Sequence, residues 1–183
     1  YDKVAAAADR IRGLPVSVNK KPAATVTDIG HMARKVKNLR CIVVDYLGKI
    51  TPDSRKQGRY EYMTEISGDL KTLARKYKVP VLALAQLNRA NTERSDKRPK
   101  LSDLRDTGAI EQDADGVIFL HWEDYYQEKV DRDPWEPSEL DIIVEKNRHG
   151  RTGTCKAAFY MATGRINPAK EDRRVEALEC ENT

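Results

Sequence analysis

A short apolar run that ends in a carboxylate, residues 41–47, constrains this chain more than any other feature of its sequence. The four apolar residues before Asp45 include two β-branched valines and an isoleucine, which predicts a strand buried on both faces, as in a parallel sheet. Asp45 then stands at the carboxyl end of the strand, the edge at which open α/β sheets bind ligands. An aspartate there can hold Mg²⁺ directly or through water, or it can cap the following turn. The run alone leaves both interpretations open.

Chain length and composition limit which class of protein this can be. The chain has 183 residues, of which 39% are hydrophobic and 34% charged, enough for one domain with a full hydrophobic core. No apolar run approaches the roughly 20 residues of a membrane span, and the first residues lack the order of a signal peptide. The three cysteines form no C-x-x-C pair, which disfavours a disulfide framework or zinc site and favours a reducing, cytoplasmic location. The net charge of +4 permits a polyanionic partner.

Hydrophobic periodicity predicts helices alternating with strands. We predict helices over residues 1–12, from Thr25 or Thr27 to Val36, and over 61–77, and strands over 16–18, 41–45, 79–85, 116–121, 140–145 and 155–160. The strand–helix–strand order implies a parallel sheet, and the glycine-containing turn between the last two strands indicates an antiparallel hairpin. The intervening segments read as a basic loop that either touches nucleic acid or is solvated (49–59), a mobile charged linker (91–100), and a surface insertion (123–139).

Five motifs, in order and with compatible spacing, resemble the RecA-like motor domain of the DnaB-type replicative DNA helicases. They are I-V-V-D-Y-L (42–47), E-I-S-x-x-L-K-x-L-A (65–74), V-P-V-L-A-L-A-Q-L-N-R (79–89), D-K-R-P-x-L-S-D-L-R-D-T-G-A-I-E-Q-D-A-D (96–115) and E-K-N-R-H-G-R-T-G (145–153). The match runs from about Val16 to Ile166. It implies an α/β, RecA-like three-layer fold with a mostly parallel central sheet and a C-terminal antiparallel hairpin. We expect a partial domain over residues 1–170, followed by a tail over 171–183.

The resemblance also implies roles at a bound nucleotide. Asp45 matches the Walker B carboxylate that positions the Mg²⁺ of ATP through water. Gln86 matches the strand-end glutamine that senses the γ-phosphate and couples it to the DNA loops. Lys146 and Arg148 match a basic pair that reaches across a subunit interface to a neighbour's ATP, where a guanidinium stabilises the charge that spreads over the phosphoryl oxygens. The alternative for this pair is a hairpin whose basic residues are merely solvated.

Arg105, Asp106 and Gly108 match the loop that holds the backbone of single-stranded DNA in the channel of the ring. Arginine pairs with phosphate, and glycine lets a backbone N–H come close to it. Asp106 stands where the family pattern leads us to expect Glu, and a carboxylate there orients Arg105 or accepts from a neighbouring group. The alternative is a helix-capping turn that leads into residues 109–113.

The phosphate-binding motif G-x-x-x-x-G-K-[ST] does not occur in these 183 residues. The family carries that motif, and its catalytic glutamate, upstream of the part that resembles this chain. We therefore expect the chain alone to be inactive and its parent to be an ATP-dependent DNA helicase, a hexameric ring that unwinds duplex DNA by translocating on single-stranded DNA. Primase and a helicase loader are the partners that the resemblance implies.

Two other functions compete with the helicase interpretation. The first is a non-catalytic RecA-like module that binds DNA or regulates a helicase, which the missing phosphate-binding motif favours and the retained Asp45, Gln86 and Arg148 disfavour. The second is a RecA-like recombinase or kinase relative, which the stretch Leu101–Asp115 disfavours.

Overall fold

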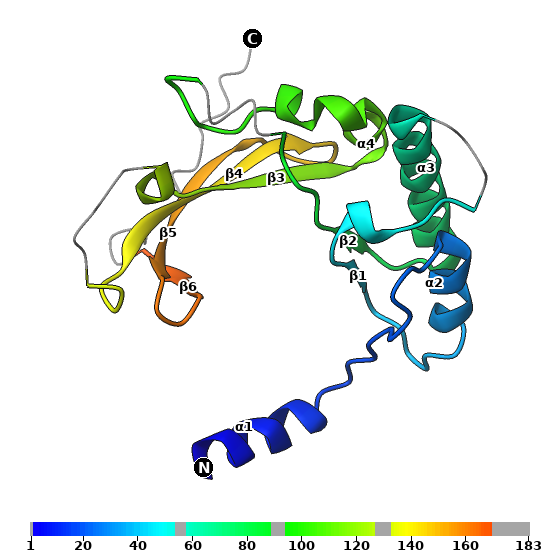
Figure 1. Ribbon diagram of the computed structural model, residues 1–183, viewed down its shortest axis with the longest axis horizontal. Helices are drawn as coiled ribbons and strands as arrows, with labels where there is room; N and C mark the ends of the chain where they lie inside the picture. The colour runs from blue at the N-terminus through cyan, green and yellow to red at the C-terminus, as the bar shows by residue number, and fades with distance from the viewer. Residues whose placement is uncertain (1, 54–57, 89–93, 127–132, 170–183) are drawn as a thin grey trace. The chain divides into compact units, whose positions relative to one another are not determined.

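The computed structural model describes residues 2–53, 58–88, 94–126 and 133–169 (Figure 1). The chain divides into two compact units. Unit 1 comprises residues 1–56 and 69–85, and unit 2 comprises residues 57–68 and 86–183. The predicted C-terminal tail lies outside the described residues.

Helix α2 (Val26–Ala33) of unit 1 begins at a capping box. The Thr25 hydroxyl accepts from the Asp28 backbone N–H at 3.2 Å, and the Asp28 carboxylate accepts from the Thr25 backbone N–H at 2.9 Å. These two bonds satisfy groups that a helix start otherwise leaves without partners. Thr25 is thus the cap, of the two threonines predicted for that role.

Helix α3 (Arg59–Tyr77) confirms the helix predicted over residues 61–77, with two further residues at its start. Its buried positions recur at helical spacing, at Met63, Ile66, Leu70 and Leu73. Of the apolar face that the spacing predicts, Ile66, Leu70 and Leu73 are buried, whereas Tyr62 and Tyr77 are half-buried. Within unit 1, a Cβ added at Gly30 of α2 would lie 3.2 Å from the Leu73 side chain, so the glycine permits close packing of α2 on α3.

Strands β1 (Ile42–Val44) and β2 (Val81–Ala83) form the parallel pair of unit 1. Ile42 faces Val81 and Val44 faces Ala83 in register, which confirms parallel pairing of the two predicted strands. Burial on both faces was wrong, because Val43 is 60% exposed and Leu82 is 57% exposed. In the described part of the chain this sheet has two strands, and in β1 the exposed Val43 lies between the buried Ile42 and Val44.

The N-terminal segment differs from the prediction in its packing. Helix α1 (Asp2–Arg12) forms where expected, but Val4 and Ile11 on its apolar face are exposed. The strand predicted over residues 16–18 has no regular structure, and Val16 and Val18 are exposed. Alternating valines favour a strand only where a neighbouring strand offers hydrogen-bond partners, and these residues pair with no strand in the described chain.

Unit 2 is built on a four-stranded antiparallel sheet in the order β3-β4-β5-β6 (Figure 1). Its strands are β3 (Gly116–His121), β4 (Ser138–Asn147), β5 (Gly153–Tyr160) and β6 (Arg165–Pro168). The antiparallel pairing of β4 with β5 confirms the predicted hairpin, and β6 extends it. A short helix, η4 (Glu123–Tyr126), follows β3.

The core of unit 2 joins this sheet to the stretch that precedes it. Buried residues Leu104, Val117, Phe119 and Ile143 form one cluster, against which Leu87, Leu101 and Ala114 pack. Leu101 and Leu104 belong to a 3-10 helix, η3 (Leu101–Thr107), which leads directly into helix α4 (Gly108–Asp113). The sheet therefore fixes the backbone on both sides of residues 105–107.

Part of the segment predicted as a mobile linker, residues 91–100, is held by ion pairs. Arg98 donates to Asp141 of β4 at 2.9 Å and to the Thr154 hydroxyl of β5 at 2.7 Å. Arg94 donates to the buried Asp103 carboxylate at 2.8 Å. The contacts of Arg98 were not predicted, because local charge density does not reveal partners more than 40 residues away. The mobility of the linker stays a prediction.

The predicted fold class is confirmed in its coarse features. The chain is α/β, with a parallel strand pair and a C-terminal antiparallel hairpin. In the described residues the strands form two sheets, and three of the four strand pairings are antiparallel, so a single mostly parallel sheet is not present there. Among these residues, no helix is both long and apolar enough to cross a membrane.

Candidate functional site

Asp45 lies at the carboxyl end of β1, as predicted. The backbone around it is fixed within unit 1, because Leu84 N–H donates to Val44 O at 2.9 Å and Leu47 N–H donates to Leu84 O at 2.9 Å. The Asp45 side chain is exposed. The next helical turn, η1 (Leu47–Lys49), has Tyr46 as its N-cap and no side-chain capping bond, so Asp45 does not cap it. Of the two interpretations left open by the sequence, the structure removes the capping role.

Gln86 follows β2 by three residues and is exposed. It is the first residue of the second segment of unit 2, whereas Asp45 belongs to unit 1. The residues after Gln86 are anchored in unit 2, because Leu87 packs on the core cluster and Asn88 N–H donates to Asp103 O at 3.2 Å. Gln86 thus occupies the strand-end position that the sequence predicts for it.

The stretch predicted to contact DNA is helical throughout. Arg105 and Asp106 lie in η3, and Gly108 is the first residue of α4. Leu104 on one side and Ala109 on the other are buried, with 5% and 6% exposure. These two anchors hold the backbone between them against unit 2.

Lys146 and Arg148 both contact α4, from the end of β4 and the turn that follows it. Lys146 Nζ donates to the backbone oxygens of Glu111 at 2.5 Å and Gln112 at 3.4 Å. Arg148 Nη2 also donates to Gln112 O. The last carbonyls of a helix have no partner within it and carry partial negative charge, so cations at this end are stabilising. Both side chains thus point toward the end of a helix in their own chain.

Arg148 has a second partner in Asp115. The Arg148 backbone N–H donates to Asp115 O at 2.8 Å, and Arg148 Nη1 lies 3.4 Å from Asp115 Oδ1. The two side chains are 43% and 54% exposed. The backbone bond therefore fixes where the two residues meet, while their side-chain ion pair is long and open to solvent. Sequence reasoning missed these contacts with α4 and Asp115, which join residues 33 to 36 positions apart.

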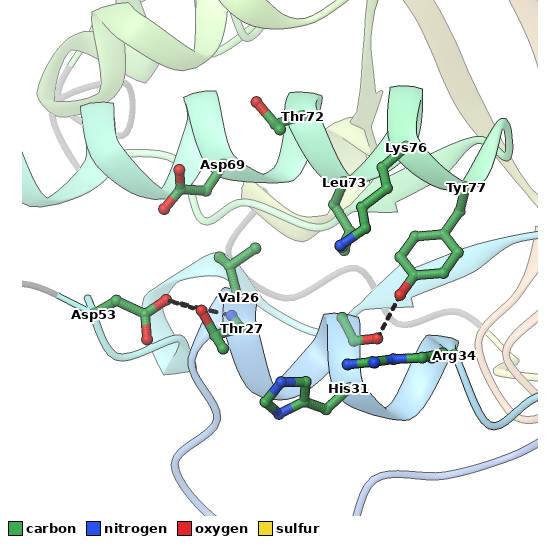
Figure 2. Close-up of a pocket in the computed structure, with 11 residues that line it drawn as sticks. Val26, Thr27, His31, Arg34, Asp53, Asp69, Thr72, Leu73, Lys76 and Tyr77 are labelled. Atoms are coloured by element: carbon green, nitrogen blue, oxygen red, sulfur yellow. Dashed lines mark hydrogen bonds between the residues drawn. The ribbon is translucent and has the colours of Figure 1, made fainter.

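A cavity of about 250 Å³ lies between α2 and the C-terminal half of α3 (Figure 2). Figure 2 shows Lys76 and Tyr77 pointing from α3 toward α2, where the Tyr77 hydroxyl donates to Gly30 O at 2.7 Å. The lining mixes basic residues (His31, Arg34, Lys76) with acidic ones (Asp53, Asp69). Its described lining holds none of the residues predicted to bind nucleotide or DNA.

Asp53 joins the start of the predicted basic loop to α2. Its carboxylate accepts from the Thr27 hydroxyl at 2.9 Å and from the Thr27 backbone N–H at 3.3 Å. Burial alone would raise the pKa of Asp53, but hydrogen bonds from Thr25 and Thr27 outweigh it and hold the pKa below its ordinary value. Residues 54–57 of that loop lie outside the described residues, so contact with nucleic acid or with solvent alone both stay predictions.

Comparison with known protein families gives one match that spans most of the chain. A family model for the DnaB-like helicase C-terminal domain matches residues 1–167. The replicative DNA helicase DnaB of Leifsonia xyli is 42% identical over 162 residues, which cover 87% of this chain and 35% of that protein. The DnaB of Geobacillus stearothermophilus is 40% identical over 163 residues, with the same two coverages. This chain thus spans about a third of the length of these curated relatives.

Solved structures agree with the sequence relatives. A DnaB-like replicative helicase, whose structure describes its interactions with primase, superposes with a TM-score of 0.83 at 33% identity. The match covers 92% of this chain and 42% of that one. A solved ATPase domain superposes with a TM-score of 0.82, also at 33% identity, over 92% of this chain and 60% of that domain.

Proposed function

This chain belongs to the family of DnaB-like helicase C-terminal domains, and we propose that it is part of an ATP-dependent replicative DNA helicase. The parent protein unwinds duplex DNA by translocating on single-stranded DNA as a ring. One observation carries this proposal. The Asp45 carboxylate stands exposed at the carboxyl end of a parallel strand, and it does not cap the next turn. That edge of a parallel sheet is where α/β proteins bind nucleotides.

The Asp45 carboxylate is a suitable ligand for the magnesium ion that accompanies ATP. Mg²⁺ binds carboxylate, water and phosphate oxygens and rarely needs an all-protein cage. A single carboxylate therefore suffices, in agreement with the described residues, which hold no cluster of three or more His, Cys, Asp or Glu side chains. When bound, the metal neutralises charge on the phosphates. In this proposal Asp45 holds it through water, and the Gln86 amide senses the γ-phosphate.

The DNA contact of the proposal falls on Arg105, Asp106 and Gly108. Phosphate contacts by arginine and by backbone N–H groups position a protein on nucleic acid without reading its sequence. The support is that residues 105–107 lie in the chain between two buried residues of unit 2, Leu104 and Ala109. A motor that moves along any sequence needs this kind of contact.

We propose that the parent protein forms a hexameric ring. In this ring Arg148, with Lys146, contacts the nucleotide bound to the neighbouring subunit. A guanidinium delivered to the phosphoryl oxygens stabilises the transition state of phosphoryl transfer. The position of both residues at the end of β4 supports this role, since a strand end and its turn place side chains at the surface of a unit.

The complete domain in this proposal is RecA-like, with three layers around a mostly parallel sheet. Residues 1–170 supply part of it, and residues 171–183 form its tail. The support is the superposition on an ATPase domain of which this chain covers 60%. Primase is proposed as a partner because a similar helicase has been solved with its primase interactions. A helicase loader and a cytoplasmic location complete the proposal.

One mutation tests the proposed function in the full-length protein. Asp45→Asn keeps the shape of the side chain and removes the charge that holds the metal. We expect single-stranded-DNA-stimulated ATP hydrolysis to fall by roughly 10² or more, the scale of several kcal/mol of metal-assisted charge stabilisation. Asp53→Asn, which removes an aspartate bound to Thr27 instead, is the matched control and should leave turnover unchanged. Equal turnover in the two variants would contradict the proposal.

The same assay separates the helicase from a non-catalytic RecA-like module. Such a module would bind single-stranded DNA through residues 105–108 but show no magnesium-dependent hydrolysis in the wild-type full-length protein. DNA binding without turnover would therefore favour that second function over the motor.

A further inference from the structure

Helix α4 connects the proposed DNA contact of unit 2 to the basic pair Lys146 and Arg148. Its first residue, Gly108, belongs to the proposed DNA contact. Its last turn carries the carbonyls of Glu111 and Gln112, which accept from Lys146 and Arg148. Six residues of α-helix span roughly 9 Å at 1.5 Å per residue. The proposed DNA contact and the basic pair therefore lie at opposite ends of one short helix.

The two basic residues are held to different degrees. Lys146 pairs with Val117 in the β3–β4 ladder, its side chain is half-buried, and its ammonium reaches two carbonyls of α4. Arg148 lies beyond the strand in the turn, is exposed, and shares one of those carbonyls. Lys146 is therefore held to α4 more firmly than Arg148, and Arg148 is the residue of the pair that leaves more readily.

The ion pair between Arg148 and Asp115 orients the Arg148 guanidinium but is weak enough to break readily. Its atoms are 3.4 Å apart, and both side chains are about half exposed. Exposed pairs of this kind shift an equilibrium by a few-fold at most, because water and salt screen them. The backbone bond from Arg148 N–H to Asp115 O keeps the two residues adjacent when the side chains part.

We propose that Asp115 is a positioning residue that holds the Arg148 guanidinium against the end of α4 in its own subunit, and that DNA bound at residues 105–108 favours its release through α4. This inference rests on the proposed function, since it assumes that Arg148 acts on a neighbour's nucleotide. The anionic partner that replaces Asp115 is then a phosphoryl group. A guanidinium suits such an exchange because carboxylate and phosphate bind it with the same paired geometry.

The contact predicts a specific kinetic change in the full-length protein. Asp115→Asn removes the negative charge and keeps the backbone bond, so the Arg148 guanidinium retains only its bond to Gln112 O and leaves the end of α4 more often without DNA. Basal kcat for ATP hydrolysis should rise about two- to fivefold, the factor that an exposed ion pair can supply. KM should stay constant, because Asp115 does not touch the nucleotide in this scheme. The DNA-stimulated rate should stay near wild type, so the ratio of stimulated to basal turnover should fall by the same factor.

Three further variants make this test specific. Asp113→Asn removes the same charge from the last residue of α4, and in the described structure Asp113 makes no hydrogen bond or ion pair with Arg148, so it should match wild type. Asp115→Glu keeps the charge and should restore the low basal rate. Asp115→Asn combined with Arg148→Ala should behave as Arg148→Ala alone, because the effect of Asp115 acts through that arginine.

The experiment measures hydrolysis with and without a single-stranded oligothymidylate, together with the hydrogen-exchange rate of the Arg148 guanidinium N–H groups, which lose their protein partners on release. The proposal expects DNA to increase exchange there in the wild type, and Asp115→Asn to increase it without DNA. If wild-type turnover responds to DNA but Asp115→Asn matches Asp113→Asn in both measurements, the positioning role is wrong and the helicase function stands. If wild-type turnover does not respond to DNA at all, the proposed function fails and the inference fails with it.

Discussion

Replacement of Lys146 by methionine tests whether the basic pair stabilises helix α4. Methionine keeps most of the length and the apolar stem of lysine and removes its ammonium. That group donates to Glu111 O at 2.5 Å and to Gln112 O at 3.4 Å, both in the last turn of α4. The substitution therefore withdraws a charged donor from carbonyls that have no partner within the helix.

The expected loss is about 2 kcal/mol in the free energy of local opening. A hydrogen bond to a charged group contributes roughly 1.5–3 kcal/mol net, and a cation at a helix C-terminus about 0.3–1 kcal/mol. The 3.4 Å contact between Lys146 Nζ and Gln112 O adds little to this free energy. Because Lys146 is only half-buried, solvent screening also limits the total free-energy loss. Because each 1.36 kcal/mol changes an equilibrium constant tenfold, this loss corresponds to a roughly thirtyfold larger equilibrium constant for local opening.

Hydrogen exchange measures this change directly, because local opening sets the exchange rate of each amide. We expect the peptide spanning residues 108–113 to exchange roughly thirtyfold faster in Lys146→Met than in wild type. The matched control is Lys156→Met in β5, which removes an exposed ion pair with Glu139 and should leave α4 unchanged. A change in α4 no larger than that of the control would refute the anchoring role of Lys146.

Three further predictions concern the helix cap, the DNA contact and pH. Thr25→Ala breaks the capping box of α2 and should cost about 1 kcal/mol in local stability, measured by exchange in residues 26–33, whereas Thr25→Ser should keep most of it. In the full-length protein, Arg105→Ala should weaken binding equally to single strands of all sequences and flatten its salt dependence by roughly one phosphate contact, and loss for one sequence alone would indicate base recognition. Asp53 has a lowered pKa, so its stabilising contacts with Thr27 are fully present above the ordinary value of 3.8 and are lost as pH falls through the folded pKa. An NMR titration of Asp53 should show its pKa rising toward 3.8 in Thr27→Ala, and an unchanged pKa would contradict this assignment.

Local sequence signals predicted the elements whose causes are local. Helix α3 followed from its apolar spacing, and the start of α2 was narrowed to two capping threonines, of which the structure shows Thr25. The β4–β5 hairpin followed from two strand patterns around a glycine-containing turn. Asp45 and Gln86 both lie beyond strand ends as predicted, because the end of an apolar run marks the end of a strand.

The features that sequence reasoning missed depend on partners far along the chain. Val43 is exposed because strand burial depends on what covers each face of a sheet, which an apolar run does not specify. Residues 94–100 are anchored because Arg98 finds Asp141, 43 positions away. In the same way, Arg148 meets the end of α4 and Asp115 through the register of β3 with β4, and that register is a tertiary property.

In the proposed function Asp45 and Arg148 serve nucleotides of different subunits, and mixing two inactive variants tests this assignment. Full-length Asp45→Ala and Arg148→Ala chains are combined under conditions in which subunits exchange, beside a dilution series of each variant with wild type. Each variant alone should lose turnover, on the order of 10³-fold for Arg148→Ala, the scale of an arginine delivered in trans. We expect partial recovery of turnover in the mixture, because some interfaces then pair an intact Asp45 with an intact Arg148. Turnover of mixed rings that never exceeds that of either variant, while the wild-type series shows that single active interfaces are detectable, would contradict it.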